Sequence, residues 1–248
     1  LLTLHNMNIV IIGTGYVGLV TGVGLASRGN VVNFIDLDEN KIKDLSSKKI
    51  TFYEPGLEEY FNDDETFKRM SFSSDYASIE WNNIDIVFVC VQTPNNIETN
   101  SVDTKFLESA IKEINNVNNN DLVITVKSTI PPYEIEKVCE KVGMDSSKLT
   151  FNPEFLREGT AVEDFFKPDR IVLGGTDTEK LTKLKVLYSG FDCEIITTDS
   201  ISSQLIKYLA NTYLPLRLSF VNEATRLINY SGGNLDDVLK GVGLDNRI

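Results

Sequence analysis

The chain has 248 residues, of which 42% are hydrophobic, and a formal net charge of -12. This length can bury one large α/β domain and part of a second one. The excess of carboxylates disfavours nucleic acid and anionic membrane surfaces as partners, because both require clustered Lys and Arg side chains.

The first six residues precede Met7 and lack the basic region and long apolar core of a signal peptide. Elsewhere, no apolar run approaches the roughly 18 to 20 residues of a membrane span. The three cysteines lack metal-ligand spacing, which argues against a disulfide framework and suits a reducing compartment. We therefore expect a cytoplasmic protein with no metal site, in which residues 1–6 form a tail.

Short β-branched segments alternate with amphipathic stretches between residue 8 and about residue 198. This alternation predicts a parallel sheet covered by helices on both faces, a doubly wound α/β fold, over a domain spanning 7–198. Continuous apolar character indicates that the strands are buried on both faces. The expected strands cover residues 8–13, 31–35, 70–73, 84–91, 122–126, 149–151, 170–173 and 194–197.

The pattern changes after residue 199 to one long helix running to about residue 230, and a second helix is expected over 234–240. A helix of such length suggests a connection between domains or a dimer surface. We therefore expect residues 199–248 to form a central helix and to support a homodimer. Its apolar stripe comprises Leu209, Tyr213, Leu216, Phe220 and Leu227.

A glycine-rich stretch, residues 13–18, follows the first expected strand and opens a helix. Its glycines permit a tight turn and let the backbone approach a pyrophosphate at the helix N-terminus. Asp36 follows the next strand, 18 residues past Gly18, where a carboxylate can bind an adenosine ribose and repel a 2′-phosphate. We therefore predict NAD rather than NADP as cofactor, against the alternative of a glycine-rich structural turn. The predicted cofactor residues here are Gly13, Gly15, Tyr16, Val17, Gly18, Asp36 and Lys41, of which Lys41 is alternatively a solvated helix residue.

Further motifs lie at the ends of expected strands, where ligands of a doubly wound sheet bind. They are FYEPGL at 52–57, VQTP at 91–94, KSTI at 127–130 and NPEFLREG at 152–159. With PDRIV at 168–172 and the helical segment 207–223, they resemble the UDP-glucose 6-dehydrogenase family over nearly the whole chain. The NPEFLREG stretch is far more specific than the glycine loop.

The resemblance implies oxidation of a nucleotide sugar's primary alcohol to a carboxylate in two hydride transfers, which consume two NAD and pass through an enzyme-bound thioester. It also implies that Thr93 and Thr129 lie near the nicotinamide and that Thr129 helps to hold the catalytic water. Glu154 would work with that water, and Glu158 would lie against both cofactor and substrate. The substrate loop would include Phe155, Leu156 and Arg157.

These roles have structural alternatives. Either threonine alternatively caps a helix, and Glu154 is alternatively a solvated loop acid. Lys207 and Asn211 are four residues apart and therefore share a helix face. The resemblance implies that this pair binds substrate and stabilises the developing oxyanion; the alternative is an exposed polar face.

Histidine base catalysis is disfavoured because the only histidine, His5, precedes the first strand. The resemblance implies a nucleophilic cysteine and a uridine-binding domain beyond residue 248, and none of Cys90, Cys139 and Cys193 has the family's flanking glycines. We therefore expect a chain that binds the cofactor but is catalytically incomplete on its own. Arg247 matches an arginine that can reach a partner subunit's substrate.

Two departures from the family pattern carry expectations of their own. Pro215 predicts a kink in the long helix, because proline removes the N–H that would bond to the carbonyl of Asn211. Residues 92 and 95–102 differ from the family's shorter glycine-containing loop, which puts the positioning of Thr93 in question.

Three functions compete at this point. The DRIV stretch at 169–172 favours UDP-glucose as substrate over GDP-mannose, although GDP-mannose dehydrogenases share much of NPEFLREG. A UDP-N-acetylmannosamine enzyme is disfavoured, since its corresponding loop reads differently. The alternative from another class is a non-catalytic module that binds NAD or forms a dimer.

Overall fold

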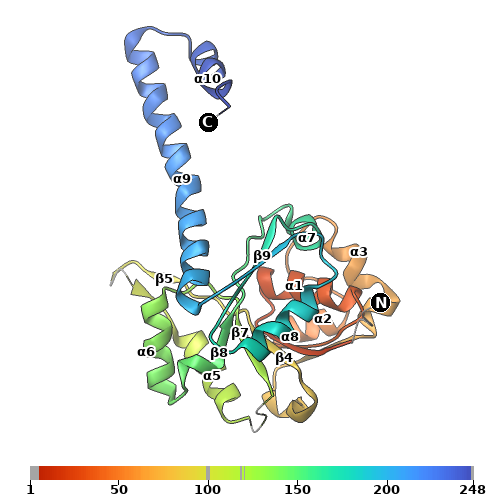
Figure 1. The fold of residues 1–248 in the computed structure, drawn as a ribbon. Helices are drawn as coiled ribbons and strands as arrows, with labels where there is room; N and C mark the ends of the chain where they lie inside the picture. The colour runs from red at the N-terminus through yellow and green to blue at the C-terminus, as the bar shows by residue number, and fades with distance from the viewer. Residues whose placement is uncertain (1–5, 99–100, 118, 120, 247–248) are drawn as a thin grey trace. The chain divides into compact units, whose positions relative to one another are not determined.

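The computed structural model describes residues 6–98, 101–117, 119 and 121–246. It divides into two compact units, a first unit that ends at Leu205 and a second that begins at Ile206. Figure 1 shows the elements of each unit. The strands are β1 (Asn8–Ile12), β2 (Val31–Ile35), β3 (Met70–Ser73), β4 (Ile86–Val89), β5 (Asn95–Asn96), β6 (Ser101–Val102), β7 (Val123–Val126), β8 (Leu149–Phe151), β9 (Arg170–Gly174) and β10 (Glu194–Thr198). The helices are α1 (Tyr16–Ser27), α2 (Glu39–Ser46), α3 (Leu57–Asn62), α4 (Asp64–Phe67), α5 (Lys105–Asn115), α6 (Pro132–Val142), α7 (Ala161–Phe166), α8 (Thr178–Tyr188), α9 (Ser200–Ser231) and α10 (Leu235–Gly243), with short 3-10 turns at Tyr76–Ser78, Trp81–Asn83 and Ser146–Lys148.

The first unit is built on one eight-stranded sheet with the order β10-β9-β8-β7-β4-β1-β2-β3. The predicted doubly wound fold is confirmed, and each of the eight expected strands is present. The fourth strand is shorter than expected, because β4 covers only Ile86–Val89 and the expected strand covered 84–91. Sequence reasoning missed a small antiparallel pair, β5 with β6.

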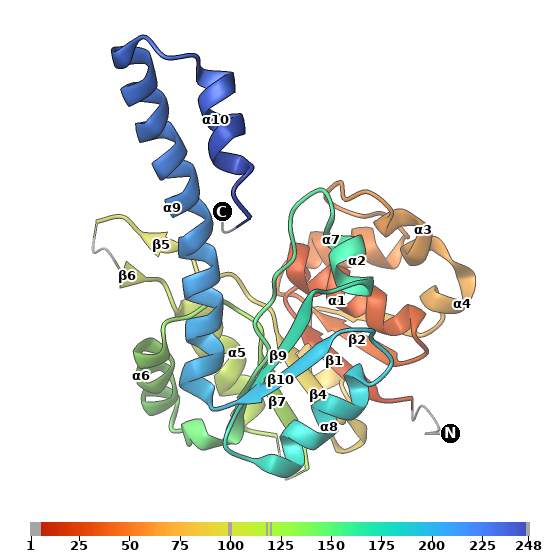
Figure 2. The ribbon, with the colours of Figure 1, turned by 45° about the horizontal axis from the view of Figure 1, so that its top comes forward.

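Helices cover both faces of the sheet, and the alternation of side chains along each strand explains why (Figure 2). On β1, Ile9 and Ile11 join a core cluster with side chains of α1, α3, α7 and α8, whereas Val10 and Ile12 join a second cluster with α5 and α6. All four side chains are at most 2% exposed. A strand that is apolar at every position is therefore what a sheet buried on both faces requires.

The order of the strands reverses between β1 and β4, because β2 lies on one side of β1 and β4 on the other. Both pairs are parallel, so the carboxyl ends of β1, β2, β4 and β7 lie along the same edge of the sheet. Such a reversal leaves a crevice beyond the strand ends, which is the usual ligand site of this fold. The glycine turn, Asp36 and the VQTP and KSTI motifs follow these strand ends, and NPEFLREG follows β8. The expectation that FYEPGL lies at a strand end is wrong, because it lies between α2 and α3.

The expectation of an all-parallel sheet is wrong at one pair. β8 and β9 are antiparallel and meet at Phe151 and Gly174, while β9 and β10 are parallel to each other. Residues 152–169, which connect β8 to β9, form the NPEFLREG loop and the six-residue helix α7. This connection is long enough for a crossover, so its length does not determine the direction of β9. The Asn152 side chain bridges the junction, donating to the carbonyl of Val172 at 2.9 Å.

The second unit consists of α9 from Ile206 onward and α10. The predicted long helix is confirmed, and α9 continues through Pro215 as a single helix of 32 residues. The proline therefore does not end the helix, and a bend at this position stays a prediction. Gly232, with φ of 73°, closes α9, and the Asn234 side chain caps α10 by accepting from the N–H of Asp237 at 3.0 Å. Arg247 lies outside the described residues.

Candidate active site

The turn between β1 and α1 is shaped by glycines with different tasks. Gly13 has φ of 95°, and a Cβ there would lie 2.7 Å from the carbonyl oxygen of Cys90. A Cβ on Gly18 would overlap the carbonyl oxygen of Gly13, whereas a Cβ on Gly15 would meet no protein atom within 4 Å. Gly13 and Gly18 therefore let α1 pack against the sheet. Gly15, at the N-cap of α1, leaves open space where a phosphate can approach the backbone.

Asp36 stands beside this turn and is already held by protein groups. Its Oδ2 accepts hydrogen bonds from the N–H and the hydroxyl of Thr14 at 2.8 and 2.7 Å, and its Oδ1 accepts from the N–H of Asp38 at 3.0 Å. Burial opposes ionisation, but these hydrogen bonds and nearby Lys41 outweigh it and lower the pKa of Asp36. A carboxylate offers about four acceptor sites, so capacity remains on Oδ1 for a ribose hydroxyl.

Replacing Asp36 with asparagine should weaken NAD binding about 10- to 100-fold, the effect expected for one hydrogen bond to a charged acceptor. It should weaken NADP binding less or strengthen it, because the negative charge that repels a 2′-phosphate is removed. Titration calorimetry with both dinucleotides measures the change. The matched control is Asp44→Asn on α2, which removes the same charge outside the cleft. Unchanged selectivity in the Asp36 variant would contradict this assignment.

A cleft of about 580 Å³ lies along the carboxyl ends of the strands. Most of the residues predicted from the sequence to bind the cofactor or act in catalysis line it, and they come from separate strand ends. Four predicted residues do not line the cleft: Gly18 packs under the turn, Glu158 is exposed on the loop after β8, and Lys207 and Asn211 lie on α9. The predicted residues that do line it are Gly13, Gly15, Tyr16, Val17, Asp36, Lys41, Thr93, Thr129 and Glu154.

Two loops meet at the part of the cleft that contains Thr93 and Thr129. The Thr93 hydroxyl donates to the carbonyl oxygen of Thr129 at 2.7 Å, and the Ser128 hydroxyl donates to that of Val91 at 2.6 Å. Neither threonine caps a helix, because α6 begins after Pro131 without a side-chain cap and the short strand β5 follows Thr93. These bonds hold the loops after β4 and β7 together.

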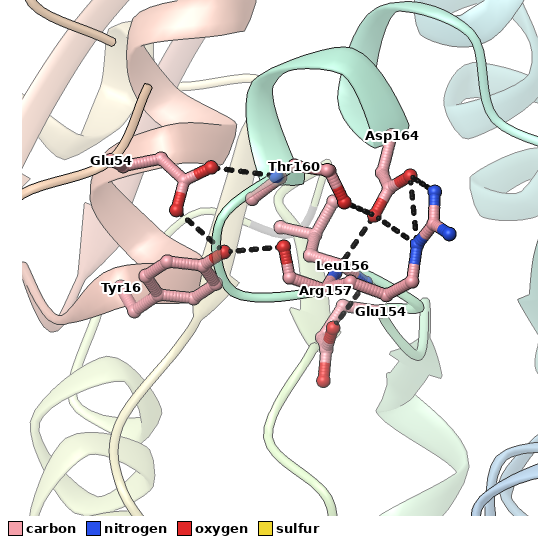
Figure 3. Close-up of polar contacts among 8 residues, drawn as sticks. Tyr16, Glu54, Glu154, Leu156, Arg157, Thr160 and Asp164 are labelled. Carbon is pink, nitrogen blue, oxygen red and sulfur yellow. Dashed lines mark hydrogen bonds and ion pairs between the residues drawn. The ribbon is translucent and has the colours of Figure 1, made fainter. Parts of the chain in front are cut away.

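Glu154 lines the same cleft from the loop after β8. One of its carboxylate oxygens accepts from the N–H of Leu156 at 2.7 Å (Figure 3), and the side chain is partly buried. These contacts are compatible with a functional carboxylate and with the alternative of a loop acid, so the role of Glu154 stays a prediction. A carboxylate in this position, with Thr129 in the same cleft, can orient a water molecule or accept its proton.

Lys127 is a cleft residue that sequence reasoning missed. It follows β7 directly, is only 7% exposed, and donates to Oδ1 of Asn152 at 2.9 Å and to the Asn152 carbonyl at 3.3 Å. The sequence did indicate a special role for Lys127, because a lysine directly after a buried strand must find hydrogen-bond acceptors for its ammonium group. For the other unpredicted lining residues, including Tyr76 and Phe106, the local sequence gives no comparable signal.

The predicted substrate residues Phe155, Leu156 and Arg157 lie outside the lining of the cleft. The Arg170 guanidinium stacks 3.9 Å from the centre of the Phe155 ring, and Leu156 packs against the core. Arg157 forms an ion pair with Asp164 of α7 and also donates its backbone N–H to that carboxylate at 2.8 Å (Figure 3). The loop is therefore shaped by contacts within itself and with its flanking elements.

All three cysteines are free thiols, and their surroundings disfavour the thiolate. Burial raises the pKa of Cys90 to about 12 and that of Cys139 to about 11, and the pKa of Cys193 is raised as well. A nucleophilic cysteine needs a lowered pKa. The prediction that none of the three is the nucleophile is therefore consistent with their environments.

Within the described part of the chain, no group of three or more His, Cys, Asp or Glu side chains is arranged to hold a metal ion. No helix among these residues combines the length and the apolar character needed to cross a membrane.

The remaining predicted pair, Lys207 and Asn211, lies on α9 in the second unit. At about 100° per residue, the two positions share one face of the helix, and the stripe that contains Leu209, Tyr213 and Leu216 lies on the opposite face. All five residues of this stripe are between 59% and 67% exposed. The role of the pair in catalysis stays a proposal.

The strand order, the glycine turn and the carboxylate after β2 define a dinucleotide-binding protein of the doubly wound class. Residues 7–192 match the NAD binding domain of the UDP-glucose/GDP-mannose dehydrogenase family, and residues 201–248 match that family's central domain. The chain belongs to this family.

Individual relatives agree with this assignment. The chain is 38% identical to a UDP-glucose 6-dehydrogenase of Rickettsia felis over 98% of its own length and 55% of the relative's. A solved UDP-glucose dehydrogenase of Pyrobaculum islandicum matches with a TM-score of 0.89 and 33% identity over 100% of this chain and 59% of that one. A GDP-mannose dehydrogenase of Pseudomonas aeruginosa matches with a TM-score of 0.88 and 27% identity over 98% of this chain and 58% of that one. The chain thus spans little more than half the length of these relatives.

Proposed function

We propose that the protein carrying this chain is an NAD-dependent dehydrogenase that oxidises UDP-glucose to UDP-glucuronate by two hydride transfers, and that the chain supplies the NAD site and part of the catalytic site. The observation that carries the proposal is one cleft that contains both a dinucleotide-type glycine turn with Asp36 and a second group, Thr129 and Glu154, whose oxygens could orient a water molecule. A site for cofactor binding alone does not need the second group.

The cofactor fits this cleft on geometric grounds. The open space at Gly15 admits a pyrophosphate, and Asp36 retains an acceptor for a ribose hydroxyl. NAD bound there would accept hydride from the carbon that bears the alcohol. Thr93 and Thr129 line the cleft from the adjoining loops after β4 and β7 and would border the nicotinamide.

Other residues of the chain would serve the hydrolytic step, oxyanion stabilisation and substrate binding. Glu154 and Thr129 would orient water for the hydrolytic step. Lys207 and Asn211 would bind the negative oxygen that develops on the sugar carbon, as a cation and an amide donor can in a site that excludes water. Glu158, Phe155, Leu156 and Arg157 would contribute to the substrate loop.

The substrate is tested with the full-length protein by measuring NADH formed from UDP-glucose, GDP-mannose and UDP-N-acetylmannosamine in separate reactions. The proposal expects NADH from UDP-glucose, with two NADH for each sugar nucleotide consumed. NADH from GDP-mannose alone would move the assignment to a GDP-mannose 6-dehydrogenase. NAD binding without oxidation of any sugar nucleotide would favour a non-catalytic cofactor-binding or dimerisation module.

We further propose that α9 forms a homodimer through the apolar stripe Leu209, Tyr213, Leu216, Phe220 and Leu227. Its support is the exposure of all five side chains, since apolar patches of this kind usually mark an interface. The stripe lies opposite Lys207 and Asn211 on the helix, so a second copy could bind there without covering the polar pair.

Replacing Leu216 with lysine should convert a dimer into a monomer in sedimentation velocity, because it places a charge at the centre of the stripe. Asn222→Lys is the matched control, since Asn222 lies on the opposite side of the same helix and is also exposed. A wild-type protein that sediments as a monomer, or a Leu216 variant that remains dimeric, would exclude this interface.

A further inference from the structure

Glu54 is a buried carboxylate that the proposed mechanism does not use. It lies just before α3, in the FYEPGL stretch, and is 5% exposed. One carboxylate oxygen accepts from the N–H of Ala161 at 2.7 Å, and the other accepts from the N–H of Gly159 at 2.8 Å. These two groups belong to the end of the NPEFLREG loop and the start of α7, more than 100 positions away in sequence.

Tyr16 connects this carboxylate to the cofactor turn. Its hydroxyl lies 3.0 Å from the second oxygen of Glu54 and 2.8 Å from the carbonyl oxygen of Arg157 (Figure 3). Burial and the hydrogen bond to Glu54 raise the pKa of Tyr16 far above its usual value, so the hydroxyl keeps its proton and donates it. Tyr16 is also the first residue of α1 and lines the cleft.

Phe155 and Leu156 hold the middle of the loop through Arg170 and the core, but the end of the loop at 157–160 has a different set of contacts. Asp164 binds Arg157 and the Thr160 hydroxyl, but it belongs to α7 and moves with the same segment. Glu54 instead comes from a separate part of the chain, between α2 and α3, and is therefore a fixed point for the loop. A shift of the loop would displace Glu154, which lines the cleft from its other end.

We propose that Glu54 is a positioning residue that, with Tyr16, fixes the loop of residues 152–160 relative to the glycine turn and so sets the place of Glu154 in the active site. The inference rests on the proposed function for its catalytic consequence. The attachment of the loop by Glu54 does not depend on the proposed function.

The test replaces Glu54 with glutamine, which has nearly the same shape. The N–H groups of Gly159 and Ala161 face different oxygens of Glu54, so the NH2 of a glutamine held in the same place would put a donor against one of these donors. Hydrogen exchange, followed by mass spectrometry on peptides covering 155–163, should become about 10- to 100-fold faster in this variant. Glu58→Gln is the matched control, because Glu58 is an exposed glutamate four residues on, and it should leave exchange in these peptides unchanged.

The kinetic readout in the full-length protein separates positioning from general destabilisation. Glu54→Gln should lower kcat by roughly 10- to 100-fold, because small misplacements of catalytic groups are costly, while KM for NAD changes less than about threefold. Glu54→Asp, which retains two acceptor oxygens, should recover part of both the exchange protection and kcat. Tyr16→Phe should give an intermediate increase in exchange.

Unchanged exchange at 155–163 in Glu54→Gln would overturn the proposal, and so would faster exchange spread evenly over the whole protein with no recovery by aspartate. A wild-type protein that oxidises no nucleotide sugar would refute the proposed function. In that case the exchange measurements would still decide whether Glu54 anchors the loop.

Discussion

Replacing Gly15 with alanine should weaken NAD binding without lowering the unfolding temperature, whereas replacing Gly18 with alanine should impair both. Gly15 has φ of -69° and ψ of -172°, which alanine adopts readily, and its Cβ would meet no protein atom within 4 Å. The methyl group would instead occupy the space that a pyrophosphate needs. An overpacking cost of about 1 to 3 kcal/mol corresponds to roughly a 5- to 150-fold rise in Kd.

Gly18 provides the contrast. Its Cβ would overlap the backbone carbonyl of Gly13, so no change of side-chain rotamer can relieve the clash, and α1 must move away from the sheet. Calorimetry with NAD and differential scanning calorimetry on both variants give the two readouts.

Gly22 is unsuitable as a control, because a Cβ there would meet the ring of Phe34. Gly241→Ala is a better control, since Gly241 lies in α10, has no positive φ, and an added Cβ there would meet no atom within 4 Å. Equal loss of stability in the Gly15 and Gly18 variants would contradict the division of roles.

Replacing Lys207 with methionine should lower kcat for NADH formation by about 100- to 1000-fold, the range measured when one oxyanion donor is removed. Methionine preserves much of the side chain's length and removes the charge. The Kd for NAD should not change, because the residues that line the cofactor cleft belong to the first unit. Steady-state kinetics with UDP-glucose and calorimetry with NAD separate the two effects.

Arg217→Met is the matched control for this variant, since it removes one exposed positive charge from the same helix. It should leave kcat unchanged. A Lys207 variant with wild-type kcat, or one whose only defect is a weaker Kd for NAD, would remove lysine from the proposed chemistry.

Local patterns were sufficient to predict most of the first unit. The eight strands and the long α9 follow from apolar runs and helical periodicity, and the Gly13–Gly18 turn with Asp36 follows from spacing along one βαβ unit. The family resemblance, rather than local pattern, assigned Thr93, Thr129 and Glu154 to the site, and they line one cleft because the carboxyl ends of parallel strands meet at the same edge.

The features that the sequence could not predict depend on contacts between distant segments. An apolar strand does not indicate its direction, so the reversal of β9 relative to β8 leaves no periodic trace. Glu54 is separated from Ala161 by 107 positions, and nothing near either residue indicates the hydrogen bond. Lys127 differs, because its place after a buried strand was visible and its need for acceptors followed from that position.

Calorimetric titration of the folded protein with NAD and with NADP tests the central claim most directly. The cleft with its open Gly15 and its ionised Asp36 predicts saturable binding of NAD and much weaker binding of NADP. Failure to bind NAD, or a preference for NADP, would contradict the account.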